Sequence, residues 1–159
     1  MKDRTFRHDF QVAGVLLLVL CAAVPLLAGV KNWAVIAAAG SKLQDVSLAD
    51  LSKYCKGTQK TWPDGRNFML VVRNPNSPEM RDAMQKLFGT AGPEVKAPTT
   101  KSGESRPVMK VVDTDEDLIR TVAATPGAIG LLDVYSINSS VKVLRVEGRL
   151  PFDAGYSLK

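Results

Sequence analysis

The sequence predicts a three-layer α/β domain in which a mostly parallel or mixed sheet is flanked by short helices. Apolar runs of strand length alternate with amphipathic helical segments from residue 33 to about residue 146, a pattern typical of strands joined by helical crossovers. Once an apolar N-terminal stretch is set aside, roughly 130 residues remain, which is enough for one core. We therefore expect an export or anchoring segment at residues 1–30 and one domain at residues 31–159.

The N-terminal stretch has the composition of an export segment. Residues 12–30 carry no charge, they follow the basic side chains of Lys2, Arg4 and Arg7, and Pro25 lies near their end with small residues after it. This order is typical of a secretory signal peptide. Nineteen apolar residues are also long enough to span a bilayer as an uncleaved helix. Both alternatives place the domain in the periplasm or another extracytoplasmic space.

Composition excludes several classes of function. The formal charge is +5, but basic and acidic residues are interspersed, so no nucleic-acid surface is expected. The only histidine, His8, precedes the apolar run, and Cys55 is the only cysteine outside it. Without histidine, the usual acid–base routes are closed and a zinc site is not expected. We therefore predict a non-enzymatic protein that needs no cofactor, with Cys55 as a buried structural thiol.

The expected elements follow from the hydrophobic period and from helix caps. Continuous apolar runs indicate buried strands, and alternation at the last strand indicates an outer or hairpin strand. Ser47, Ser77 and Thr114 are expected to cap three helices, the second of which begins at Pro78. A flexible loop is expected at about residues 90–107, where Gly, Pro, Ser, Thr and Lys dominate. The expected strands are residues 33–39, 67–72, 108–112, 128–132 and 141–146.

The junction after the second strand is the candidate binding site. A helix N-terminus offers N–H groups and a dipole that favour an anion. Ser77 adds a hydroxyl there, and Arg73 adds a guanidinium whose planar fork matches an oxyanion. We predict an oxyanion site at Arg73, Asn76 and Ser77, with an ordinary helix cap beside a surface arginine as the alternative.

Two other features have structural explanations. The acidic residues at positions 113 and 115–117 suggest a cation site, but carboxylates in the first turn of a helix ordinarily compensate its dipole, and we expect that role here. Trp62, beside a Pro-Asp-Gly turn, is expected to pack over the edge of the core rather than to stack on a ligand.

Two segments resemble the phosphate-type substrate-binding proteins of bacterial ABC transporters. DVSLADLSKYCKGTQKTWPDG (residues 45–65) is similar to their S-L-x-x-L…F-x-G…x-W-x-D-G segment, and DEDLIRTVAATPGAIGLLD (residues 115–133) to their D-x-x-L-x-x-V-x-x-x-P-G-A-I-G-Y segment. The resemblance covers residues 33 to about 146 and corresponds to one lobe of the two-lobed type 2 periplasmic binding fold. It implies a short, single-lobe member, with phosphate or another small oxyanion as ligand and a membrane transporter or a second protein chain as partner.

The binding motif of the family is only partly present. In two-lobed members, the second lobe holds phosphate through an arginine, three residues and then Ser-Gly-Thr at a helix start. Arg73 and Ser77 match, whereas Pro78 removes a backbone N–H and Glu79 adds a negative charge. The resemblance therefore implies weak oxyanion binding linked to transport. The alternative is an interaction or assembly module of the cell envelope that kept the fold and lost the ligand.

Overall fold

The computed structural model describes residues 32–89 and 108–159. The export or anchoring segment and the loop expected at residues 90–107 lie outside the described residues. Within the described part of the chain, no helix is long and apolar enough to cross a membrane.

A five-stranded mixed sheet with the strand order β4-β3-β5-β1-β6 forms the middle of the domain. β3 is parallel to β4 and β5, whereas β1 is antiparallel to both β5 and β6. A separate ribbon pairs β2 with β7 in parallel. The strands are β1 Trp33–Ala38, β2 Asp45–Val46, β3 Met69–Arg73, β4 Met109–Val112, β5 Ala128–Asp133, β6 Val141–Val143 and β7 Arg145–Val146.

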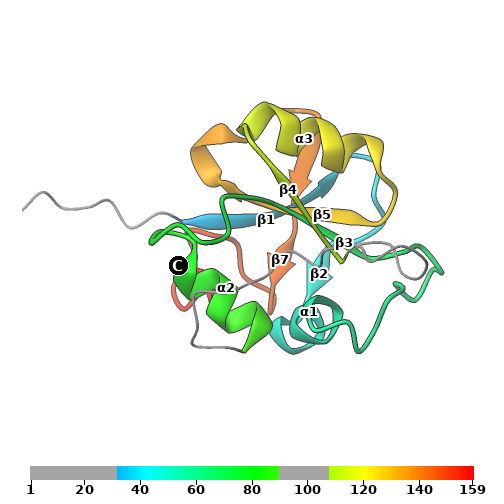
Figure 1. Ribbon diagram of the computed structural model, residues 1–159, viewed down its shortest axis with the longest axis horizontal. Helices are drawn as coiled ribbons and strands as arrows, with labels where there is room; N and C mark the ends of the chain where they lie inside the picture. Colours follow the sequence, from blue (N-terminus) through cyan, green and yellow to red (C-terminus); the bar gives the residue numbers. More distant parts are fainter. Residues whose placement is uncertain (1–31, 90–107) are drawn as a thin grey trace, which may run out of the picture.

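Helices cover both faces of this sheet. α1 (Leu48–Cys55) and α2 (Arg81–Phe88) lie on one face, and α3 (Asp115–Ala124) lies on the other (Figure 1). A short 3-10 turn, η1 (Val134–Ser136), follows β5. The predicted three-layer α/β class is confirmed, with a mixed sheet.

The last expected strand, residues 141–146, is divided between the two sheets. Val141–Val143 pairs with β1, whereas Arg145–Val146 pairs with β2. Leu144 lies at the bend, where its side chain is fully buried and its N–H donates to the Val35 carbonyl at 2.8 Å. The burial of Leu144 turns the chain from the five-stranded sheet to the β2–β7 ribbon. The alternation of residues 141–146 does not indicate this bend.

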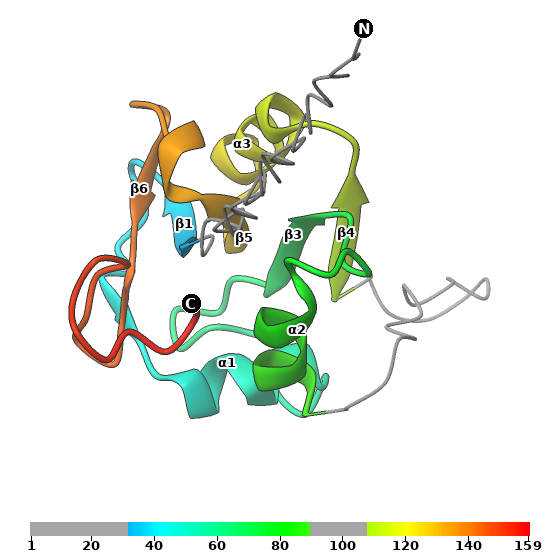
Figure 2. The same cartoon turned by 90° about the vertical axis from the view of Figure 1, so that its left-hand side faces the viewer.

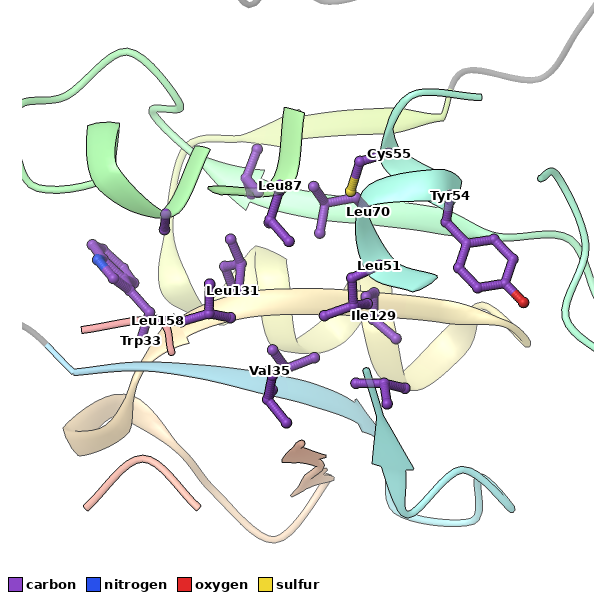
Figure 3. Close-up of a cluster of buried hydrophobic side chains, with 14 of the residues drawn as sticks. Trp33, Val35, Leu51, Tyr54, Cys55, Leu70, Leu87, Ile129, Leu131 and Leu158 are labelled. Atoms are coloured by element: carbon purple, nitrogen blue, oxygen red, sulfur yellow. The ribbon is translucent and has the colours of Figure 1, made fainter. Parts of the chain in front are cut away.

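The sheet separates two hydrophobic clusters. The larger one packs β1, β3 and β5 against α1 and α2, with Leu51, Leu70, Leu87 and Leu131 at its centre (Figure 3). Residues that alternate with these in the strands point to the opposite face and pack against α3. Each such side chain contributes roughly 1.5–3 kcal/mol when fully buried, so the two clusters fix the helices on the sheet.

An aromatic group closes the edge of the larger cluster, as expected for Trp62. The Trp62 ring lies against Tyr54 and Phe68, with centroid distances of 4.4 and 5.6 Å. Its Nε1–H donates to the Gly127 carbonyl at 2.8 Å. This bond joins the two segments whose sequences resemble the substrate-binding proteins, so Trp62 has a structural role.

Two buried groups make stability sensitive to alkaline pH. Burial raises the pKa of the Cys55 thiol from 9.0 to about 12 and that of the Tyr156 hydroxyl from 10.0 to about 12. In both groups the pKa in the folded state lies above the ordinary value. The stability that the two buried, neutral groups contribute is therefore fully present below about pH 9 and is lost as the pH rises toward 12. Cys55 is buried, as predicted.

We expect urea unfolding measured from neutral pH to about pH 11 to show this loss. Above its ordinary pKa, each group lowers the free energy of unfolding by about 1.4 kcal/mol per pH unit. Tyr156→Phe is expected to flatten the part of the slope above about pH 10, because only Cys55 then titrates. A free energy that stays constant up to about pH 11 would contradict the burial of both groups.

Candidate functional site

The carboxyl ends of β3, β4 and β5 lie together at one edge of the sheet because the three strands are parallel neighbours. The connection from β3 to β4 contains α2 on one face, and the connection from β4 to β5 contains α3 on the other (Figure 1). Ligands of open α/β sheets bind at such places, where successive crossovers leave to opposite faces. The start of β1 reaches the same edge, since Trp33 pairs with Asp133.

A pocket of about 140 Å³ opens at this edge. A single water needs roughly 10–15 Å³ of such space, so the pocket has room for a small ion. It is lined by Trp33, Arg73, Asn74, Ser77, Glu79, Asp115, Leu131 and Asp133. The structure thus brings two of the three predicted site residues, Arg73 and Ser77, to one cavity. The third, Asn76, is exposed and is not part of the lining.

The turn between β3 and α2 differs from the prediction. α2 begins at Arg81, so the expected start at Pro78 is wrong by three residues. Residues 77–80 form a tight turn instead, in which the Met80 N–H donates to the Ser77 carbonyl at 3.1 Å and to Ser77 Oγ at 3.3 Å. Met80 itself is fully buried, which draws the turn into the core.

This turn changes what Ser77 offers to a ligand. The Ser77 N–H donates to the Asn74 carbonyl at 3.1 Å, and the Arg81 N–H donates to the Ser77 carbonyl at 3.1 Å. The N–H groups of Ser77, Met80 and Arg81 are therefore engaged, and the helix start lies further along the chain than expected. The Ser77 hydroxyl and the guanidinium of Arg73 are the side-chain donors that this junction offers to a ligand.

Arg73 forms an ion pair that the sequence did not indicate. Its Nη1 lies 3.0 Å from Asp115 Oδ1, and Asp115 Oδ2 accepts a hydrogen bond from Ser136 Oγ at 2.7 Å. The arginine side chain is 53% exposed and the aspartate 27%. The expected cap of α3 is present, since Thr114 Oγ1 accepts from the Asp117 N–H at 3.1 Å. Asp115 thus lies in the first turn of a capped helix and also pairs with Arg73.

The charge of the lining opposes a simple anion. Glu79, Asp115 and Asp133 provide three carboxylates against the single guanidinium of Arg73. Asp133 Oδ1 accepts from the Tyr135 N–H at 3.1 Å, and Trp33 Nε1–H donates to the Glu79 carbonyl at 3.1 Å. Among residues 32–89 and 108–159, no group of three His, Cys, Asp or Glu side chains is placed to hold a metal ion. An oxyanion at Arg73 would compete with Asp115, the carboxylate that already pairs with this guanidinium.

Asp133 was not among the predicted site residues, although a signal for it exists. It directly follows the buried apolar run of β5, and the carboxyl ends of parallel strands meet at one edge. Applying that rule to the ends of β3 and β5 together would have found Asp133 alongside Arg73.

Comparisons with known proteins support the fold. No protein-family model matches the sequence, and no curated protein matches it. The structure is similar to an ABC-type phosphate transport receptor from Vibrio cholerae, with a TM-score of 0.60 and 20% identity over 76% of this chain and 48% of that one. It is also similar to PstS from Borrelia burgdorferi, with a TM-score of 0.60 and 18% identity over 80% of this chain and 54% of that one.

These similarities define the class of fold. The domain has the fold of about one half of these proteins, consistent with the single lobe that the sequence resemblance implied. More particularly, its solved neighbours are phosphate transport receptors, and the chain spans about half of their length.

Proposed function

We propose that this chain is an extracytoplasmic, non-catalytic, solute-binding-like protein that binds a small oxyanion weakly, in connection with ABC-type transport. The observation that carries the proposal is the convergence of Arg73 and Ser77 on one pocket at the carboxyl ends of the parallel strands. The fold shared with two phosphate transport receptors and the apolar N-terminal residues support it.

Arg73 supplies the attraction. A guanidinium carries five N–H donors, and within the described residues only Nη1 of Arg73 has a hydrogen-bond partner. Its half-exposed side chain leaves the other donors accessible to an oxyanion. A charge-assisted hydrogen bond of this kind contributes about 1.5–3 kcal/mol. A dissociation constant of about 1 mM needs about 4.1 kcal/mol, so this bond alone gives an affinity of several to tens of millimolar.

The three carboxylates also favour one kind of oxyanion. An ionised carboxylate only accepts hydrogen bonds, so it repels an anion without a proton and accepts a bond from one that has a proton. At neutral pH phosphate carries at least one proton and sulfate carries none. We therefore expect phosphate to bind more tightly than sulfate.

The test is a titration of the protein with phosphate and with sulfate, followed by calorimetry and by thermal unfolding. The expected result is saturable binding of phosphate at millimolar concentration, weakened about tenfold or more in Arg73→Gln. Arg120→Gln is the matched control, because Arg120 forms a similar exposed pair with Asp117 at 2.9 Å but does not line the pocket. No response to phosphate, or an equal loss in both variants, would contradict the proposal.

A second candidate is an interaction or assembly module of the cell envelope. It is favoured by the acidic residues in the pocket lining and by the fact that the match spans only about half of each receptor. A membrane transporter or a second protein chain would then contact this edge. If the phosphate titration shows no binding and the protein self-associates in solution, this candidate is preferred.

A further inference from the structure

An exposed aromatic pair lies beside the pocket. The Tyr135 residue is 84% exposed and the Phe152 residue 65%, and their ring centroids are 6.3 Å apart. Among the described residues, the one other large hydrophobic residue with comparable exposure is Val111, at 43%. Two solvent-exposed aromatic rings in mutual contact indicate a surface that meets something apolar.

This aromatic pair lies where the N-terminal part of the chain enters the domain. The Val134 N–H, one residue before Tyr135, donates to the Asn32 carbonyl at 3.2 Å. The C-terminal segment that carries Phe152 reaches the same place, since Tyr156 Oη donates to the Trp33 carbonyl at 2.8 Å. Figure 2 looks onto this end of the sheet, where the start of β1 and the C-terminus lie near each other.

The sequence before this point is the uncharged run of residues 12–30. Only Lys31 separates the last residue of that run from Asn32. Two residue steps span at most about 7 Å of extended chain. If the run crosses a bilayer, it therefore holds this end of the domain against the lipid headgroups, at the level where aromatic side chains are enriched in membrane proteins.

We propose that residues 12–30 are retained as a membrane anchor and that Tyr135 and Phe152 insert into the lipid interface beside it. The tether supplies the high local concentration that two side chains need to bind a membrane. The sheet edge that holds the pocket then faces the bilayer, because Asn32 precedes β1 at this same edge. This proposal is independent of whether the pocket binds an oxyanion.

The surroundings of the pair indicate an apolar attachment. The neighbouring carboxylates belong to Asp133 and Asp153, and each accepts a backbone N–H in its own turn, from Tyr135 at 3.1 Å and from Leu150 at 2.7 Å. The segment that carries Phe152 also contains one basic side chain, Arg149, which donates to the Gly155 carbonyl at 3.0 Å. Two carboxylates against one guanidinium give no net attraction to anionic lipid. We therefore expect insertion that depends neither on anionic lipid nor on moderate salt.

The experiment uses the full chain, reconstituted in phosphatidylcholine vesicles that contain brominated lipid. Tyr135→Trp places a fluorophore at the pair, and its emission is compared with that of the unsubstituted protein, whose Trp33 and Trp62 are buried. Thr58→Trp is the matched control, because Thr58 is exposed in the loop that precedes β3, away from the carboxyl edge. We expect brominated lipid to quench the added emission of the Tyr135→Trp variant and to leave that of the control variant unchanged. Adding Phe152→Ser to Tyr135→Trp is expected to reduce the quenching.

Three outcomes would overturn this proposal. The first is equal quenching of the added fluorophore in both variants, or quenching in neither. The second is an emission from position 135 that shifts to shorter wavelength only at high protein concentration. That result would indicate that the aromatic pair contacts a second copy or another protein instead of lipid. The third is a mass for the protein isolated from membranes that shows residues 1–30 to have been removed. Quenching at position 135 alone, in a chain of full mass, supports the proposal.

Discussion

Gly127→Ala is expected to lower the free energy of unfolding by roughly 3–5 kcal/mol, a large part of the roughly 5–15 kcal/mol that typical domains have. Gly127 has φ +86°, and a Cβ there would lie 2.3 Å from the Asn67 carbonyl oxygen. That oxygen belongs to the backbone just before β3, so it has little freedom to move away. The substitution would also displace the Gly127 carbonyl, which accepts the buried Trp62 N–H.

Gly57→Ala separates the two causes of this loss. Gly57 has a similar φ of +74°, but a Cβ there would have no atom within 4 Å. Its expected cost is therefore only the backbone term of about 1–2 kcal/mol. Urea unfolding of both variants measures the difference. Equal losses would show that Gly127 is not closely enclosed by the backbone at Asn67.

Asp115→Asn is expected to tighten phosphate binding by about tenfold, which corresponds to about 1.4 kcal/mol. Asp115 holds Arg73 Nη1 at 3.0 Å and places a negative charge in the pocket lining. Asparagine keeps the shape and an acceptor for the Ser136 hydroxyl, but it removes the charge. The Coulomb energy of such a pair is several kcal/mol at low effective dielectric, and solvent exposure of Arg73 reduces it to the smaller value.

Asp117→Asn is the control for losing a negative charge anywhere in the first turn of α3. Asp117 lies in the same first turn of α3 and pairs with Arg120 rather than Arg73. Phosphate titration by calorimetry should therefore give an unchanged affinity for this variant. A gain of the same size in both variants would mean that overall charge, rather than the pair of Arg73 with Asp115, sets the affinity.

Features set by nearby residues were predictable from the sequence. Ser47 accepts the Asp50 N–H at 2.9 Å and Thr114 accepts the Asp117 N–H at 3.1 Å, and both bonds depend on a spacing of three residues. The buried strands and the α/β class follow likewise from local periodicity. The antiparallel insertion of β1 between β5 and β6 and the bend at Leu144 depend on contacts between distant segments, which no local pattern contains.

The candidate site shows the same division. Arg73 and Ser77 are four residues apart in one junction, so their convergence was foreseeable. Asp115 is 42 residues from Arg73 and reaches it only because β4 lies beside β3 in the sheet. Burial of Met80 moved the start of α2 to Arg81, so the helix N-terminus lies further from Ser77 than the sequence suggested.

Phosphate titration followed by amide nuclear magnetic resonance tests the oxyanion proposal most directly, because it reports where the anion binds. We predict that the largest saturable shifts occur at the amides of Arg73, Asn74, Asn76 and Ser77 and at the start of α3, and that they disappear in Arg73→Gln. Shifts centred on another part of the domain, or the absence of saturable shifts at millimolar phosphate, would contradict it.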